Sequence, residues 1–419
     1  MKAKLLKFLK KTKLLNVKNK FKRPYVYNEQ VIFTVGAICK YLKIDIPKKY
    51  QDISKKRVDQ TKLISKLQNK KDIENNTKKQ KNKSVEYYRL ARKYFREFKI
   101  KYDTQECLKD KSNEKLLEMA VEGFYTFRSY GFNYNDYFDY ELYNKKISDL
   151  PKFLNSRYRT YIYKLLNDRE VGHKYFKDKY GFNKKFAKYV NRDFVIPYEQ
   201  GKEEFEKFVK KHPRFFAKPV GGTGGYDAGI MELKDNFDEL YNKIVEGKYI
   251  CEEIVKQHKD LAAFNSDTLN TCRLYTLLKT DGKAYVTMAN SRYGRKGNEV
   301  DNFHSGGVSA GIDVETGKVV TDAINRAHIK CVKHPDSGLK FKGSQIPLWE
   351  EAVKAVTEMA ETIPEVRHIG WDVAFTSDNK IELIEGNAWP NFDITQAVDQ
   401  KGKMHRYEKH IKEWEEVLK

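Results

Sequence analysis

Two short runs of β-forming residues near the carboxyl end constrain the fold of this chain more than any other feature. They are residues 370–376 (GWDVAFT) and residues 381–387 (IELIEGN). The intervening residues 377–380 (SDNK) have the composition of a tight turn, so the sequence predicts a β-hairpin. With Asp378-Asn379 as a two-residue loop, the strand ladder places Asp372 opposite Glu385.

This predicted pairing brings acidic side chains together on one face of the hairpin. Opposed residues have Cβ atoms roughly 4.5–5.5 Å apart, and Asn387 shares the face of Glu385. Two facing carboxylates destabilise a sheet unless a cation lies between them, and hard oxygen donors suit Mg²⁺. Asp372, Glu385 and Asn387 are therefore candidate magnesium ligands. A solvated hairpin face with unrelated acidic residues is the alternative, and the hairpin alone does not decide.

The positive charge of the chain is concentrated at its amino-terminal end. The formal charge is +23, and residues 1–83 contain 25 Lys/Arg against 6 Asp/Glu, which leaves a net charge of +4 for the other 336 residues. A nearly neutral body offers no basic groove, so specific nucleic-acid binding is not expected. The length and a hydrophobic content of 40% indicate two or three globular domains.

The spacing of the cysteines and the length of the apolar runs indicate where in the cell the protein is expected. The five cysteines lack CxxC spacing, which favours reduced thiols over a zinc site or a disulfide framework. The apolar run 31–39 is too short to span a bilayer, and there is no recognisable signal peptide. We therefore expect a protein on the cytoplasmic side. Residues 1–23, with ten Lys/Arg and no acidic residue, fit an amphipathic helix on an anionic membrane; a solvated tail or a helix packed on the body is the alternative.

The composition changes several times along the chain. Residues 51–83 are polar and rich in lysine, as in a linker or an exposed helix. Residues 84–165 carry Tyr and Phe at helical spacing, which core packing explains better than nucleic-acid binding. Strand and helix patterns alternate after that. The predicted boundaries are 1–83, 84–165, 166–255 and 256–419.

A strand at residues 215–220 carries Lys218 and runs into a glycine-rich segment. That segment is Gly221-Gly222-Thr223-Gly224-Gly225. A glycine backbone can close over phosphates while a lysine supplies charge, although the segment lacks both the P-loop ending and the dinucleotide-binding spacing. Taken alone it also fits an ordinary turn. The next strand, 249–255, carries Glu252 and Glu253, which can accept from a ribose hydroxyl or lie near an adenine amino group; exposed acids at a strand end are the alternative.

The remaining motifs continue the α+β pattern. Strands are predicted at 270–278 and 284–289, a hairpin at 312–320, and a helix at 347–363. Between them, residues 291–294 and 301–307 form loops with more polar and glycine residues than a plain connector needs.

In this order the motifs resemble the ATP-grasp superfamily, and specifically its sugar-transfer-associated branch from bacterial surface-polysaccharide loci. The resemblance covers roughly residues 120–400. The motifs that carry it are Phe216-Ala217-Lys218-Pro219 with the glycine segment, Glu252-Glu253, Asn270-Thr271-Cys272-Arg273, Arg292, Asp301-Asn302 with Gly306-Gly307, Gly370-Trp371-Asp372 and Glu385-Gly386-Asn387.

The resemblance implies an α+β fold in which two α/β subdomains with an antiparallel central sheet clasp ATP, preceded by a helical region. Lys218 and the glycine segment 221–225 would then contact the ATP phosphates, and Glu252 and Glu253 would lie at the adenine and ribose edge. Asp372, Glu385 and Asn387 match the family's magnesium ligands.

The resemblance also implies an earlier phosphate-contacting lysine. The family tends to show Asp-Lys where this chain has Asp168-Arg169, and Lys174 is the candidate that follows.

The activity that the resemblance implies is ATP- and Mg²⁺-dependent ligation of a carboxylate to an amine through an acylphosphate, acting on a capsular or other cell-surface polysaccharide or its precursor. Arg273 and Arg292 would neutralise developing negative charge, although Arg273 can also simply brace a strand. Two alternatives remain: a kinase that phosphorylates a sugar hydroxyl, and a nucleotide-responsive scaffold for glycosyltransferases at the membrane.

Overall fold

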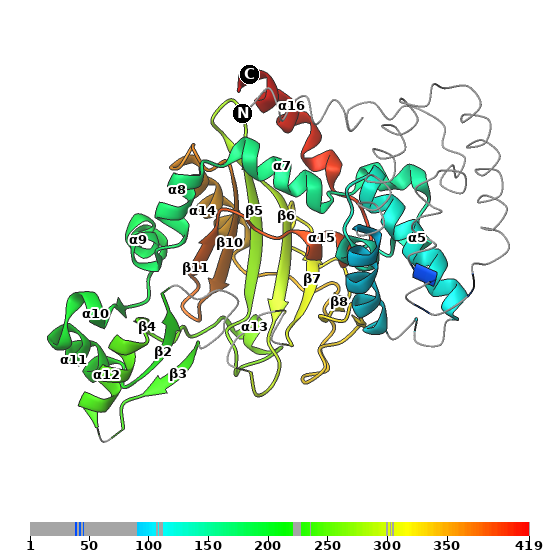
Figure 1. The fold of residues 1–419 in the computed structure, drawn as a ribbon. Coiled ribbons are helices and arrows are strands. Elements are labelled where there is room, and N and C mark those ends of the chain that lie inside the picture. The colour runs from blue at the N-terminus through cyan, green and yellow to red at the C-terminus, as the bar shows by residue number, and fades with distance from the viewer. Residues whose placement is uncertain are drawn as a thin grey trace, which may run out of the picture. The chain divides into compact units, whose positions relative to one another are not determined.

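The computed structural model describes residues 38, 39, 42, 45, 90–105, 108, 112–220, 228–234, 236–298, 301, 303 and 306–418. The chain divides into two compact units, Met1–Arg159 and Thr160–Lys419, each treated by itself below (Figure 1). The basic segment 1–23, the segment 51–83 and the glycine segment 221–225 lie outside the described residues. The four predicted domains and their bounds remain predictions. Within the described residues, the structure contains no helix with the length and apolar character needed to cross a membrane.

The first unit is helical in its described part. Residues 90–103 form a helix. The elements that follow are α5 (Asn113–Ser129), α6 (Tyr134–Asp139), η3 (Leu142–Asn144), η4 (Ile147–Lys152) and α7 (Ser156–Leu166), which continues into the second unit. α5 begins where the Ser112 side chain accepts from the Lys115 N–H, and α6 begins at a capping box formed by Asn133 and Asp136.

Aromatic side chains form the core of this unit. Tyr94 and Phe98 from the first helix and Phe124 from α5 are at most 6% exposed, and the ring of Phe98 lies 4.7 Å from that of Phe138 on α6. The sequence prediction that these aromatic residues serve packing is therefore confirmed.

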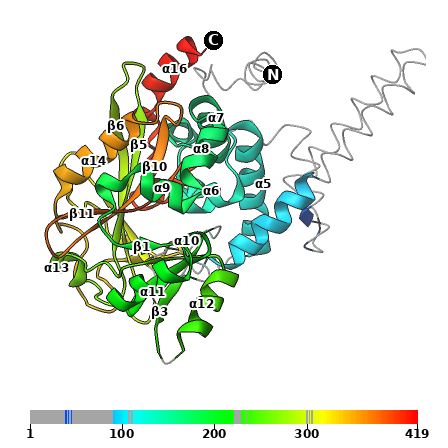
Figure 2. The ribbon, with the colours of Figure 1, turned by 90° about the vertical axis from the view of Figure 1, so that its left-hand side faces the viewer.

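The second unit contains a four-stranded antiparallel sheet in the order β1-β4-β2-β3. Its elements are β1 (Phe194–Val195), α10 (Pro197–Gln200), α11 (Lys202–Lys211), β2 (Arg214–Pro219), β3 (Gly229–Glu232), α12 (Phe237–Glu246) and β4 (Tyr249–Glu252). Phe205 and Phe208 of α11 and Ile244 of α12 pack on Phe215 of β2, so these two helices cover one face (Figures 1 and 2).

A second sheet has seven antiparallel strands in the order β11-β10-β5-β6-β7-β8-β9. The strands are β5 (Thr271–Leu278), β6 (Ala284–Tyr293), β7 (Val308–Ile312), β8 (Ala323–Ile324), β9 (Lys330–Cys331), β10 (His368–Phe375) and β11 (Ile381–Asn387). The helices of this part are α8 (Arg169–Phe176), α9 (Lys179–Lys185), η5 (Ala187–Tyr189), α13 (Lys259–Ala262), α14 (Trp349–Glu361), α15 (Asp393–Ala397), η7 (Met404–Arg406) and α16 (Glu408–Val417). The predicted α+β class and antiparallel central sheet are confirmed.

Alternation along the strands gives the large sheet one apolar face. Leu274 of β5 and Val373 of β10 share a buried cluster with Val356 and Met359 of α14. Trp371 joins the same cluster and is fully buried. Arg273 and Asp372 occupy the alternate positions and therefore lie on the opposite face.

The turn between β10 and β11 differs from the predicted one. The Thr376 N–H donates to the Lys380 carbonyl at 2.8 Å, and Phe375 pairs with Ile381. The loop therefore contains three residues, 377–379, and the prediction of a two-residue Asp378-Asn379 loop was wrong. The third loop residue is Asn379, whose φ of 58° is left-handed; Asn tolerates this conformation better than most residues.

A β-bulge then corrects the register. Val373 still pairs with Leu383, but the next pair is Asp372 with Glu385, which leaves Ile384 as the extra residue on β11. The predicted Asp372–Glu385 pairing is thus confirmed, although the loop count used to derive it was one residue short.

Candidate active site

The centre of the site is a row of polar side chains that crosses three strands. Glu385 of β11, Asp372 of β10 and Arg273 of β5 are consecutive cross-strand partners. Arg273 donates from Nε to Asp372 Oδ1 and from Nη2 to Oδ2 at 2.5 Å, and its Nη2 lies 3.6 Å from Glu385 Oε1. Arg292 of β6 donates to Asp372 Oδ2 at 3.0 Å. Two guanidinium groups therefore hold one buried carboxylate.

The pKa values of the two carboxylates in the row are shifted in opposite directions. Burial by itself would raise the pKa of Asp372, but Arg273 and Arg292 outweigh it and lower that pKa to about 2. Partial burial and the facing Asp372 carboxylate raise the pKa of Glu385. Asp372 is thus held ionised, whereas the charge of Glu385 is only partly compensated.

The donor set fits Mg²⁺. Three of the about four lone-pair positions of Asp372 accept from arginine, and one remains. The Glu385 side chain is 47% exposed, and the Asn387 side-chain oxygen accepts only one N–H, that of Trp389, among described residues, at 2.8 Å. Two carboxylates and an amide can together offer three hard oxygen ligands, with water completing an octahedral shell.

Lys218 lies at the end of β2 and contacts the first of the two predicted glutamates. Its Nζ is 2.8 Å from Glu252 Oε2, and Arg192 Nη2 is 2.9 Å from Glu252 Oε1. Burial would raise the pKa of Glu252, but Arg192 and Lys218 lower it to about 2. Lys218 is therefore positioned where β2 meets the glycine segment, with a carboxylate as its partner.

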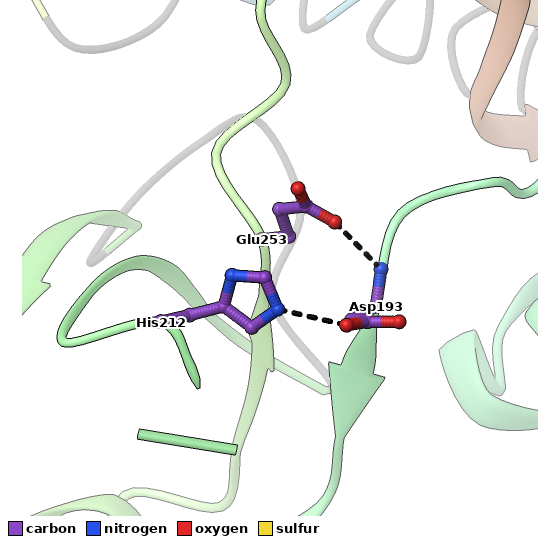
Figure 3. Close-up of side chains that lie close together, drawn as sticks. All are labelled: Asp193, His212 and Glu253. Carbon is purple, nitrogen blue, oxygen red and sulfur yellow. Dashed lines mark hydrogen bonds and ion pairs between the residues drawn. The ribbon is translucent and has the colours of Figure 1, made fainter. Parts of the chain in front are cut away.

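Glu253 has a different environment (Figure 3). Its Oε2 accepts the Asp193 N–H at 3.1 Å, and the Asp193 carboxylate accepts from His212 Nε2 at 2.8 Å. Asp193, His212 and Glu253 have ligand atoms within 4.8 Å of one another, the spacing of a possible metal site. Asp193 already forms an ion pair with Lys211, so an ion-pair network explains this cluster.

A lysine that was not predicted, Lys179, contacts the end of β2. Lys179, at the start of α9, donates from Nζ to the carbonyl oxygens of Pro219 and Val220, immediately before the glycine segment. Burial and the neighbouring Lys218 lower the pKa of Lys179 to about 8, and Glu385 and Glu252 act in the opposite direction. The Nζ of Lys174 lies 5.1 Å from the ring of Tyr175.

Three residues at the site were missed, Lys179 among them. Arg192 donates to Glu382 Oε1 at 2.5 Å as well as to Glu252, and so connects the two sheets. Asn290, the cross-strand partner of Arg273, is 1% exposed, and its side-chain oxygen has no hydrogen-bond partner among described residues. For Lys179 a signal existed, because Asp178-Lys179 is an Asp-Lys pair ten positions after the place where it was sought.

The loop motif 301–307 is described only in part. The Asp301 carboxylate accepts from the backbone N–H of Thr271 at 2.9 Å and from its hydroxyl. Burial raises the pKa of Asp301 to about 6, although the neighbouring Arg292 opposes the shift. The Asp301 carboxylate therefore holds the first residue of β5, the strand that carries Arg273. Asn302 lies outside the described residues.

A strand-borne lysine before a glycine segment, a buried glutamate on the paired strand β4 and an acidic hairpin agree with an ATP-grasp fold. The model of the sugar-transfer associated ATP-grasp family matches residues 152–413, and the chain belongs to this family. No curated protein matches the chain.

Three of the solved structures that resemble the chain do so at low sequence identity. The ATP-grasp ligase PsnB, in complex with a precursor variant, Mg and ADP, matches at 12% identity and a TM-score of 0.34, over 56% of each chain. N5-carboxyaminoimidazole synthetase from Staphylococcus aureus with ADP matches at 10% and 0.35, over 54% of this chain and 52% of its own. D-cycloserine synthetase DcsG matches at 9% and 0.36, over 62% and 77%. The chain thus spans little more than half the length of the first of these.

Proposed function

We propose that this chain is an ATP- and Mg²⁺-dependent ligase that joins a carboxylate to an amine through an acylphosphate. We further propose a sugar-linked substrate, such as a capsular or other cell-surface polysaccharide or its precursor, modified on the cytoplasmic side. The observation that carries the proposal is the row Glu385–Asp372–Arg273–Arg292 in a member of an ATP-dependent family. Such a row combines metal ligands with cations that can accept developing negative charge.

The proposed chemistry has two steps. A substrate carboxylate oxygen attacks the γ-phosphorus of ATP, the bond to the β-phosphate oxygen breaks, and ADP leaves. The amine nitrogen then attacks the acyl carbon, the C–O bond to phosphate breaks, and inorganic phosphate leaves while the amine proton passes to solvent. Bound Mg²⁺ would neutralise charge on the phosphates.

The residues of the chain have positioning and electrostatic roles in this proposal. Lys218 and the glycine segment 221–225 bind the phosphates, and we propose Lys179 rather than Lys174 as the second phosphate-contacting lysine, because its ammonium lies against the carbonyl oxygens that precede that segment. Glu252 and Glu253 lie at the adenine and ribose edge. The metal ligands are Asp372, Glu385 and Asn387.

Arg273 and Arg292 are proposed to stabilise the phosphoryl group in transfer. Both are held by Asp372, so their guanidinium groups are oriented before substrate arrives, which lowers the cost of reorganisation. Asn290, on the same face as Arg273, is proposed to bind the amine substrate, whose N–H can donate to the buried side-chain oxygen.

Product analysis tests this function. The purified chain is incubated with ATP, Mg²⁺ and combinations of uronic-acid sugars and amines, and products are separated. We expect ADP and free phosphate in equal amounts only when carboxylate and amine are both present. ADP with a stable phosphorylated sugar would instead identify a kinase, and acceptor-independent binding of ATP without turnover would support the scaffold.

A further inference from the structure

The edge of the large sheet farthest from β11 carries a surface that the ligase chemistry does not use. Here it is named the edge segment, residues 318–342. It contains β8 and β9, and a bridge between Lys333 and Lys340 closes a hairpin after β9. Because β9 and β11 are the two ends of the strand order, the edge segment lies across the sheet from Glu385 and Asn387. Figure 1 shows β8 next to β7 on this side.

Exposed aliphatic side chains are concentrated in the edge segment. Six large hydrophobic residues are strongly exposed among those the structure describes, and four of them belong to it. They are Val320 (47%), Ile329 (42%), Val332 (56%) and Leu339 (41%). Isolated exposed aliphatic residues are ordinary, but four within 20 positions form a local feature that needs an explanation.

The same segment holds the net positive charge of the body. It has six Lys/Arg against two Asp/Glu, a net of +4, and that equals the net charge of residues 84–419 as a whole. Lys330, Lys333, Lys340 and Lys342 are exposed and form no ion pair with another described residue. The Asp336 carboxylate does not neutralise them, because it binds Arg295 at 2.8 Å.

The segment is firmly seated on the sheet. Ala323, Ile324 and Phe341 are at most 2% exposed, and buried His334 hydrogen-bonds the Gly294 carbonyl through Nε2 at 2.9 Å. The exposed aliphatic and basic side chains thus project from a backbone whose other side chains form part of the core. They are not residues of an incompletely packed core.

Protection of a sheet edge explains only half of this pattern. Lysines on an edge strand discourage pairing with another chain, but exposed Ile, Val and Leu on the same edge would favour it. A soluble acidic polymer would use the lysines and leave the aliphatic groups in water. An anionic bilayer uses both, since aliphatic groups enter the boundary of the acyl region while lysine stems extend so that their ammonium groups reach the lipid phosphates.

We propose that the edge segment docks on an anionic lipid surface. Residues 329–333 and 339–342 supply the contact, with Val332 and Leu339 inserted at the interface and Lys330, Lys333, Lys340 and Lys342 at the headgroups. This surface is distinct from the basic residues 1–23. It does not depend on the proposed ligase activity, because docking requires neither ATP nor turnover.

The test uses the full chain with vesicles of phosphatidylcholine, either pure or mixed with phosphatidylglycerol. Cosedimentation measures affinity, and hydrogen exchange measures protection of backbone amides. We expect binding only to the mixed vesicles, with slower exchange in residues 326–342. A full chain that binds the mixed vesicles without protection of this segment, does not bind them, or binds pure phosphatidylcholine equally well contradicts the proposal.

Variants locate the contact. The double variant Val332→Asp/Lys333→Glu should lower vesicle affinity about tenfold or more. Val417→Asp, at an exposed valine of α16 (62%), and Lys354→Glu, at an exposed lysine of α14, should change it less than about twofold. Equal effects in variant and controls overturn the proposal, and so does equal protection by soluble polygalacturonate or by raised protein concentration without lipid. If the double variant does not fold, hydrogen exchange of the wild-type chain with and without vesicles tests the proposal by itself.

Discussion

Asp372 and Glu385 face each other across β10 and β11 because two changes of register cancel. The loop is one residue longer than the tightest turn, and Ile384 adds one residue to β11 before Glu385 is reached. Without the bulge, Asp372 would pair with Ile384, and Glu385 would turn towards the opposite face. The bulge therefore brings the two carboxylates to the same face of the hairpin.

Removing either facing carboxylate should abolish turnover. Asp372→Asn and Glu385→Gln preserve side-chain size but remove the charge that would hold Mg²⁺, so we expect ATP hydrolysis to fall about 100-fold or more. Circular dichroism should remain that of the wild type for Glu385→Gln, whose side chain is half exposed. Glu315→Gln, on an exposed turn, serves as the control. Normal turnover in Glu385→Gln would refute its role as a ligand.

The hairpin could be predicted because the sequence signals that specify it lie within a few consecutive residues. Residues 370–376 and 381–387 combine β-propensity with turn residues, and the carboxylates stand out on them. The loop length could not be predicted, since Ser-Asp-Asn-Lys fits both two- and three-residue loops. A bulge that compensates for the extra loop residue has no mark in a single sequence, so the correct pairing was reached from an incorrect count.

The parts of the site that were missed depend on distant contacts. Arg192 and Glu382 are 190 positions apart. No sequence motif around Arg192, which precedes a short strand, predicts such a distant partner. Asn290 is unremarkable until its pairing with Arg273 is known. Lys179 occupies an Asp-Lys pair, but only the fold brings α9 to the end of β2. Motifs thus predicted the residues that stand in recognisable local patterns, whereas tertiary structure was needed to find Arg192, Asn290 and Lys179.

Nucleotide affinity should depend on the protonation of Lys179. Its pKa of about 8 means that the ammonium loses its proton at mildly alkaline pH, and neutral lysine attracts phosphate less. ATP affinity should therefore be highest near neutral pH and fall as pH rises through about 8. Calorimetry measures this for the wild type, for Lys179→Met and for Lys174→Met.

In Lys179→Met we expect weaker binding and a flat profile above neutral pH. Lys174→Met should keep both the affinity and the pH dependence of the wild type. The opposite result, in which Lys174→Met alone weakens binding, would support the assignment made from the sequence.

Arg192 should be critical for stability. It is 3% exposed at its side chain and bridges Glu252 and Glu382, so Arg192→Met leaves two buried carboxylates without it and should cost about 3–5 kcal/mol of unfolding free energy. Lys211→Met breaks the exposed ion pair with Asp193 and should leave the unfolding free energy almost unchanged, because solvent screens that pair. Urea denaturation measures both.

The loss of unfolding free energy in Arg192→Met should also depend on pH. The folded-state pKa of Glu252 is about 2, below its ordinary value of 4.5, so its stabilising contribution is present above pH 4.5 and is lost as pH falls towards 2. The difference between the wild type and Arg192→Met should therefore shrink in acid. A difference that is constant with pH would mean that Arg192 acts by packing alone.

Gly386, between the proposed metal ligands Glu385 and Asn387, should be required because no side chain fits there. A Cβ at this position would lie 2.7 Å from ring carbons of both Phe176 and Phe182. Gly386→Ala therefore forces β11 away from α8 and α9, and we expect a loss of about 1–3 kcal/mol in unfolding free energy. Because Glu385 and Asn387 move with the strand, the Mg²⁺ dependence of nucleotide affinity should weaken as well.

A second substitution distinguishes this clash from a general loss of flexibility. Phe182→Leu shortens one of the two opposing side chains, so the double variant Phe182→Leu/Gly386→Ala should lose less stability than the sum of the single variants. Denaturation of all three proteins gives the coupling energy. Titration of nucleotide with and without Mg²⁺ measures how strongly nucleotide affinity depends on the metal. Strict additivity would show that the rings are not what excludes a side chain at Gly386.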